Sequence, residues 1–280
     1  KSVKVWDVAT GKATSTLPGH VEGVKSVCLS PGGSRVVSSA GDSSVCVRDV
    51  SSGKVLDLVP GHTDNVTSVA FSGDGGVLMS GADGDKVHVA SAGGGSASSG
   101  APGLDRGAST TMSGHSGPVS VAAFSRDGKR LVSGSAADND LKVWDVGSGK
   151  VLHTLPGLGE EVSSAALSGD GSTLAVVGAG NTVDVVDVKS GEVVQSLRGS
   201  SKPLSVATSA DGTHVVTGSA DGDVDVWHVP SGGKVQTLRG HTDDVTAVGL
   251  SADGSKVVSA SEDKSVKVWD VATGKATSTL

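Results

Sequence analysis

The sequence is poor in the residues that usually dominate protein interfaces and stabilise small secreted domains. Among 280 residues it has no tyrosine, two phenylalanines, four tryptophans and two cysteines. Two cysteines cannot make a disulfide framework, so we expect a reducing, intracellular location, cytoplasmic or another compartment. No apolar run approaches the roughly 20 residues that a membrane-spanning helix needs, which excludes that class. The first residues, Lys-Ser-Val-Lys-Val-Trp, also lack the apolar stretch of a secretory signal.

The charge of the chain is weak and mixed in sign. With 23 basic and 30 acidic residues the net charge is −7, so the sequence lacks the basic surface that a nucleic-acid backbone requires. We therefore expect neither nucleic acid nor membrane as a partner. What the chain has instead is 42 glycines and an apolar share of 36%. That share is enough to offset chain entropy, and the abundance of valine, glycine and serine favours a globular β protein.

Two short sequence markers recur along the chain. The dipeptide Gly-His, or a degraded form of it, begins at Gly19, Gly61, Gly114, Gly157, Gly199 and Gly240. Successive glycines are 42, 53, 43, 42 and 41 residues apart. A second marker, Trp-Asp, begins at Trp6, Trp144 and Trp269, and degraded forms of it stand in the other periods. A period of about 40 to 45 residues with both markers resembles the WD-repeat β-propeller family, over essentially the whole chain.

Each period contains four β-rich runs separated by turns. In the last period they are 245–250, 256–261, 265–271 and 275–280. The pair Asp253-Gly254 between the first two is typical of a tight turn that needs a positive φ. Four short antiparallel strands make one propeller blade, and blades must stack to bury both faces. We therefore predict an all-β propeller of four-stranded antiparallel blades with no long helix.

This pattern divides the chain into six complete blades and a half-blade. The predicted blades are 18–59, 60–113, 114–155, 156–197, 198–239 and 240–280, and their first strands are expected to begin near Val21, Val66, Val119, Val162, Leu204 and Val245. Residues 1–17 have the pattern of third and fourth strands only, and they are identical to residues 264–280. Either copy could complete the last blade, and the displaced copy could then swap into a neighbouring molecule. A seven-position ring that uses the half-blade is the alternative.

One gap between markers exceeds the others by about 11 residues. The excess lies in 92–103, a Gly/Ser/Ala-rich segment with almost no side chain that could pack. We expect a flexible loop between the third and fourth strands of the second blade.

The polar residues of each repeat allow two interpretations. In the last repeat His241, Ser259, Asp263 and Trp269 have the spacing of the structural tetrad of WD-repeat proteins. Ser, His and Asp could also form a hydrolase triad, but a triad needs one nucleophile at a single cleft, and this set recurs. The further copies are His115, Ser133, Asp138 and Trp144; His20, Ser38 and Asp42; and Thr217, Asp221 and Trp227. The resemblance implies a buried chain from the indole N–H through Ser to His and Asp, which stabilises each blade.

Four blades depart from the complete tetrad. The departures are Gly84 and Ala90 beside His62 and Ser80 in the second blade, Leu158, Val176, Gly180 and Val186 in the fourth, Ser200 in the fifth and Arg48 in the first. Losing all four polar members together leaves no partner unsatisfied, whereas a partial loss does. We expect the second and fourth blades, and the first with Arg48, to be the weak points of the fold.

The resemblance also implies where a partner would bind. Members of the family usually bind on the face with the loops that enter the first strands and leave the second strands. At those positions stand Glu22, Asp64, Asn65, Glu161, Lys202, Asp243, Asp244 and Glu262. Most of these are acidic, which favours a basic peptide or protein as the partner. The alternative is that they form a solvated rim, since the tryptophans that interfaces favour are already used by the blades.

We therefore expect a non-enzymatic scaffold for protein–protein interaction, with no catalytic residue, metal or cofactor. The eight histidines have no metal-ligand spacing. Two alternatives stay open. A propeller enzyme would need a site in the central channel, where the first strands offer mainly Ser, Thr, Val and Ala. An engineered or recently duplicated propeller without an evolved ligand would account for the identity of 1–17 and 264–280.

Overall fold

The fold is built almost entirely of β-strands. The computed structural model describes residues 2–7, 10, 12–59, 62–92, 109–135, 137–156, 162–178, 180–251 and 253–280. These residues form six four-stranded antiparallel sheets, one two-stranded sheet and a single 3-10 turn, η1 (Val229–Ser231). The predicted class, four-stranded blades without a long helix, is thereby confirmed. No helix in the described part is long and apolar enough to cross a membrane. The predicted loop at 92–103 lies, beyond Ala92, outside the described residues.

The strands fall into two compact units, and the first (1–7 and 12–159) holds the half-blade and three blades. The half-blade is β1 (Ser2–Asp7) and β2 (Lys12–Pro18). The first blade is β3 (Val24–Leu29), β4 (Arg35–Ala40), β5 (Val45–Asp49) and β6 (Val55–Val59). The second is β7 (Val66–Phe71), β8 (Val77–Ala82), β9 (Lys86–Ser91) and β10 (Ser109–Ser113). The third is β11 (Val119–Phe124), β12 (Arg130–Ser135), β13 (Asp140–Asp145) and β14 (Val151–Pro156).

The second unit (8–11 and 160–280) holds the other three blades. The fourth blade is β15 (Ser164–Leu167), β16 (Thr173–Val177), β17 (Thr182–Asp187) and β18 (Glu192–Arg198). The fifth is β19 (Pro203–Thr208), β20 (His214–Ser219), β21 (Val224–His228) and β22 (Gly233–Leu238). The sixth is β23 (Val245–Leu250), β24 (Lys256–Ser261), β25 (Val266–Asp270) and β26 (Lys275–Thr279).

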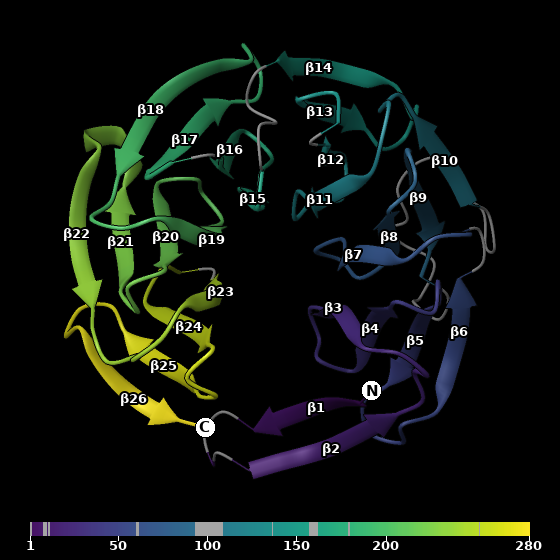
Figure 1. The fold of residues 1–280 in the computed structure, drawn as a ribbon, viewed down its shortest axis with the longest axis horizontal. Coiled ribbons are helices and arrows are strands. Elements are labelled where there is room, and N and C mark those ends of the chain that lie inside the picture. Colours follow the sequence, from purple (N-terminus) through teal and green to yellow (C-terminus); the bar gives the residue numbers. More distant parts are fainter. Residues whose placement is uncertain are drawn as a thin grey trace. The chain divides into compact units, whose positions relative to one another are not determined.

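Each blade is a meander whose strands are neighbours in chain order. In the first unit the strands β3, β7 and β11 gather on one side and β6, β10 and β14 on the other (Figure 1). The turn between first and second strands explains this order, because it closes with little strain. Gly254 has φ 71°, in the left-handed region that favours glycine. Just before it, the Ser251 hydroxyl donates to Asp253 Oδ1 at 2.6 Å. The same Ser-x-Asp-Gly turn recurs in blades two to five.

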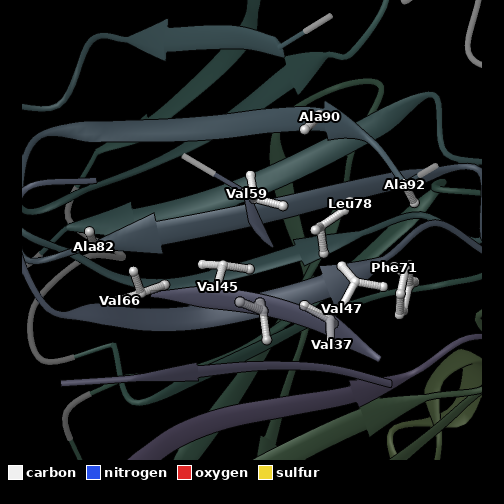
Figure 2. Close-up of a cluster of buried hydrophobic side chains, with 11 residues drawn as sticks. Val37, Val45, Val47, Val59, Val66, Phe71, Leu78, Ala82, Ala90 and Ala92 are labelled. Carbon is white, nitrogen blue, oxygen red and sulfur yellow. The ribbon is translucent and has the colours of Figure 1, made fainter. Parts of the chain in front are cut away.

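The core lies between blades, because each blade stacks its apolar face on the first two strands of the next. Between the first and second blades, Val37 and Val47 pack with Phe71 and Leu78 in one buried cluster (Figure 2). Equivalent clusters join the fourth to the fifth blade and the fifth to the sixth. A fully buried Val or Leu stabilises by about 1.5–3 kcal/mol. The stability of one blade therefore depends on its neighbours.

The two identical segments have different places in the fold. Residues of β25 and β26 complete the sixth blade. The copy in β1 and β2 makes a separate two-stranded sheet, whose Val3 and Leu17 pack on Val36 of the first blade. In this structure the N-terminal copy therefore does not displace residues 264–280. The blade boundaries given above stay a prediction.

The start of the first strand in the first blade was predicted wrongly. We expected it near Val21, but β3 begins at Val24. The Val21 N–H donates to the Asp42 carboxylate at 3.1 Å instead of joining a strand. Two other starts differ slightly from the prediction: β15 begins at Ser164 where Val162 was expected, and β19 begins at Pro203 where Leu204 was expected.

Candidate functional site

The structure brings the four tetrad residues of the sixth blade into one hydrogen-bonded chain. The Trp269 indole N–H donates to Ser259 Oγ at 2.7 Å. The Ser259 hydroxyl is then free to donate to His241 Nε2, 2.8 Å away, and His241 Nδ1 lies 2.7 Å from Asp263 Oδ2. The His241 side chain is fully buried and the Asp263 side chain is 10% exposed. The chain thus links the loop before β23 to the second and third strands of its blade.

The third blade repeats this geometry. Trp144 Nε1 donates to Ser133 Oγ at 2.8 Å, and the same hydroxyl lies 2.7 Å from His115 Nε2. His115 Nδ1 lies 2.9 Å from Asp138 Oδ2. All four residues predicted for this blade are therefore in contact.

The glycine before each tetrad histidine has a steric reason. A Cβ added at Gly240 would lie 3.2 Å from the Trp269 ring, and one at Gly114 would lie 3.1 Å from the Trp144 ring. Gly240 also has φ 152°, which side chains rarely adopt. The Gly-His marker therefore reflects the close approach of this backbone to the buried indole.

The tetrad aspartates are held as carboxylates. The Ser265 hydroxyl donates to Asp263 Oδ1 at 2.7 Å and is the largest cause of the lowered pKa of Asp263. In the third blade, burial tends to raise the pKa of Asp138, but donation from His115 and the Ser116 N–H lowers it overall. A charged carboxylate therefore anchors each histidine.

In the first blade an arginine takes the place of tryptophan. His20 Nε2 lies 2.8 Å from Ser38 Oγ, and its Nδ1 lies 3.5 Å from Asp42 Oδ2. Arg48 is 9% exposed and its guanidinium lies over Gly19. Burial tends to raise the pKa of Asp42, but donation from Ser44 and from backbone N–H groups lowers it to about 2. The three polar members predicted here are together, and the buried guanidinium of Arg48 lies beside the glycine that precedes His20.

In the second blade only the His–Ser half of the tetrad network is present. His62 Nε2 lies 2.7 Å from Ser80 Oγ. Gly84 occupies the position of the tetrad aspartate. The His62 ring instead contacts the His88 ring edge-on, with 4.4 Å between the ring centroids. Burial, followed by the nearby His88, lowers the pKa of His62 to about 4. Sequence reasoning did not find this histidine pair, although the position of His88 two residues before Ala90 could have indicated it.

The fifth blade splits the network into two separate pairs. Trp227 Nε1 donates to Thr217 Oγ1 at 3.1 Å, and the Ser200 hydroxyl donates to Asp221 Oδ2 at 3.3 Å. In the fourth blade Val176 and Val186 are buried at 2% and 0% exposure. There an apolar pair replaces the hydrogen bond from tryptophan to serine, while Leu158 lies outside the described residues.

The residues predicted to bind a partner stand in the loops that lead into the first strands, except Glu262, which stands in the turn after the second strand β24. A backbone hydrogen bond ties each loop to the end of a second strand: Gly41 N to Gly23 O, Asp83 N to Asn65 O, Ala220 N to Lys202 O and Glu262 N to Asp244 O. In the first unit Glu22, Asp64 and Asn65 lie in such loops, and in the second unit Lys202, Asp243 and Asp244 do, while Glu262 is joined to them by its bond to Asp244. Glu161 lies outside the described residues. The structure brings these residues together blade by blade.

The acidic members of these loops are not neutralised. Glu22, Asp64, Asp243 and Glu262 are exposed, and Asp244 is half-buried. None of these five carboxylates forms an ion pair with another residue of the described part. Among the described residues no group of His, Cys, Asp and Glu side chains could hold a metal ion.

Comparison with known proteins agrees with the blade geometry. Five segments match the family described as "WD domain, G-beta repeat", namely residues 11–49, 53–89, 108–145, 191–228 and 232–270. Each segment runs from the outer strand of one blade to the third strand of the next. The interval 146–190, which contains β14 of the third blade and β15 to β17 of the fourth, has no match among them. The blade whose first three strands lie in that interval is the one whose tetrad is apolar.

Several known proteins are similar to the chain, among them the following three. Autophagy-related protein 16 of Arabidopsis thaliana is 28% identical over 202 residues, which cover 72% of this chain and 29% of that protein. WD repeat, SAM and U-box domain-containing protein 1 of Gallus gallus is 50% identical over 44 residues, 16% of this chain and 9% of that protein. An uncharacterized WD repeat-containing protein of Synechocystis is 37% identical over 62 residues, 22% of this chain and 18% of that protein.

The chain spans less than a third of the length of each of these relatives. The family matches cover about two thirds of the chain, in five segments that follow the strands of the blades. The chain therefore belongs to the WD40 family, the WD domain with G-beta repeats.

Proposed function

We propose that this chain is a non-enzymatic scaffold that binds a basic peptide or protein segment at its acidic entry loops. By this name we mean the loops that carry Glu22, Asp64, Asp243, Asp244 and Glu262. WD40 propellers generally mediate protein–protein interaction. The observation that carries the finer proposal is the set of unpaired carboxylates described above. In the sixth blade Asp243, Asp244 and Glu262 lie in two loops joined by a backbone hydrogen bond, so their charges are held close together. Fixed charges of one sign attract a partner of the opposite sign.

The serine and histidine residues favour a structural role over hydrolysis. Ser133 and Ser259 are at most 1% exposed, and each already accepts an indole N–H. A nucleophile must reach a substrate at an open cleft, and these hydroxyls do not. The buried tetrads support the scaffold proposal. An intracellular location belongs to the same proposal and is supported by the two free cysteines, Cys28 and Cys46.

The proposal is tested with synthetic peptides rich in Lys and Arg, against Asp- and Glu-rich peptides of equal length. The site variant is Asp243→Asn with Glu262→Gln, and the matched control is Asp57→Asn with Glu192→Gln. Both pairs are exposed, and both change the net charge equally. We expect the chain to bind the basic peptides, and the site variant to bind them about 3- to 10-fold more weakly than the control. Equal affinities for both variants, or no preference for basic peptides, would refute the proposal.

A further inference from the structure

The half-blade β1–β2 has the same backbone arrangement as the outer half of the sixth blade. Trp6 pairs with Ala13 as Trp269 pairs with Ala276, and the register shifts just before both tryptophans. In the sixth blade, β25 also pairs with β24, with Val258 opposite Val268 and Val257 opposite Trp269. Among the described residues β1 pairs with β2 alone. One edge of β1 therefore offers the backbone groups that its identical copy uses to bind a second strand.

An apolar surface is uncovered on the strand β3 of the same unit. Val27 and Leu29 are 51% and 46% exposed. Their counterparts in the second blade, Val69 and Phe71, are 5% and 7% exposed, because they pack in the cluster that contains Val37 and Val47 of the preceding blade. The half-blade covers Val36 of the first blade, which is 0% exposed. It lacks a second strand, so no residue of the described part that corresponds to Val37 covers Val27 and Leu29.

Trp6 also lacks the contacts that its counterparts make with a second strand. Trp6 is 43% exposed, whereas Trp144 and Trp269 are 1% exposed. The indoles of Trp144 and Trp269 donate to a serine of the second strand. In the described part of the chain the Trp6 indole N–H has no such acceptor. The open edge of β1, the exposed side chains of β3 and the Trp6 indole N–H thus lack the same partner. In a complete blade, the second strand and the first strand paired with it would contact all three.

We propose that β1 and the exposed side of β3 form a docking site for a two-stranded hairpin with the pattern of the first and second strands of a WD repeat. The hairpin would come from a partner chain, because in this chain each such hairpin of the six blades is already paired in a four-stranded sheet. Its second strand adds to the edge of β1, a mode of binding known as strand addition. A valine at the position of Val258 covers Val27 and Leu29, and a serine at the position of Ser259 accepts the Trp6 indole N–H.

The sequence of a suitable hairpin is present in the chain. Residues 1–17 and 264–280 are identical, so the segment that pairs with β25, residues 240–263, has the side chains and register to pair with β1. This docking site is separate from the acidic entry loops. Its test is therefore independent of the function proposed above.

The experiment adds a synthetic peptide of residues 240–263 to the whole 280-residue chain. The peptide contains no tryptophan, so tryptophan fluorescence reports only on the chain, and calorimetry measures affinity. We expect one peptide per chain and a blue shift of the emission, because Trp6 becomes buried. The variant Trp6→Phe should remove the shift while binding persists. Absence of binding, or binding with no shift that depends on Trp6, would overturn the proposal.

Two double variants locate the site. Val27→Asp with Leu29→Asp places charges where the hairpin would pack. We expect this variant to bind the peptide at least about tenfold more weakly than the unmodified chain. The matched control, Val55→Asp with Leu152→Asp, changes side chains of nearly equal exposure, 49% and 45%, on other strands. All four positions are exposed, so both variants should fold, which circular dichroism verifies. A peptide that instead replaced β23–β24 in the sixth blade would be insensitive to Val27 and Leu29, and this result would also refute the proposal.

Discussion

Residues 1–17 and 264–280 place one sequence in two environments. Both copies form a hairpin with the same pairing, and in both a threonine hydroxyl donates to a valine carbonyl at 3.1 Å, from Thr14 to Val5 and from Thr277 to Val268. Their burial differs greatly, since Trp6 is 43% exposed and Trp269 is 1% exposed. The strand pattern and the turn are therefore encoded locally. Burial and the tetrad are supplied by the strands beside the hairpin.

The largest expected effect is that one substitution acts differently in the two copies. Trp269→Ala removes a buried ring and the hydrogen bond that Ser259 accepts from it, so we expect the free energy of unfolding to fall by about 3–5 kcal/mol. Trp6→Ala removes a half-exposed ring without a hydrogen bond, and we expect a loss of about 1 kcal/mol or less. Denaturant unfolding followed by circular dichroism measures both variants. Similar losses would mean that the two copies share one environment in solution.

The next effect compares a complete network with a broken one. His241→Ala leaves Ser259 and Asp263 without their shared partner, and we expect a loss of about 1–3 kcal/mol. Ser200→Ala touches a blade in which Ser200 makes one long contact of 3.3 Å to Asp221, so its loss should be smaller. The midpoints of denaturant unfolding give the comparison. Equal shifts for the two variants would contradict a stabilising role of the tetrad.

The sequence predicted the blades well because their signals are local. Asp253-Gly254 and the alternating valines fix turns and strands within one period, and the tetrad follows from residues at regular spacing. The sequence could not predict that Val27 and Leu29 are uncovered, since their exposure depends on a strand that another blade would supply. It also missed the contact between His62 and His88, which arises only once β9 is placed beside the loop before β7. Long-range neighbours, more than local pattern, decide such features.

A third prediction uses pH to compare the half network of the second blade with the complete one. The folded pKa of His62, about 4, lies below its ordinary value of 6.5. The unfolded chain therefore binds more protons between these values, and stability falls as the pH is lowered from about 6.5 to about 4. Asp263 has a lowered pKa, so its contribution is present above the ordinary carboxyl pKa and is lost only at lower pH.

The measurement is the free energy of unfolding as a function of pH, for the unmodified chain and for His62→Gln. We expect His62→Gln to flatten the profile between about pH 6.5 and 4, because its largest contributor there is gone. His88, whose pKa is also lowered by burial, leaves a smaller slope of the same sign. Asp211→Asn, which changes a turn carboxylate whose pKa is lowered to about 2 by donation from Ser209 and Thr213, should leave the slope in that window unchanged. A profile that stays equally steep without His62 would assign the effect to another group.

The smallest expected effect concerns a backbone position next to the tetrad aspartate. Lys264 has φ 69°, a left-handed conformation that costs a residue with a side chain about 1–2 kcal/mol. Glycine removes this cost but adds freedom to the unfolded chain, which offsets about 0.4–1 kcal/mol. Lys264→Gly should therefore raise the stability by about 0.5 kcal/mol. The position also retains its backbone hydrogen bond, since Lys264 N donates to Ser261 O at 3.1 Å and glycine keeps that donor.

The matched control is Lys275→Gly. Lys275 lies exposed in β26, where glycine weakens a strand by about 0.5–1 kcal/mol. Opposite signs for these two substitutions, measured from the unfolding midpoints, are expected, and a loss of stability in both would show that the left-handed turn at Lys264 carries no strain.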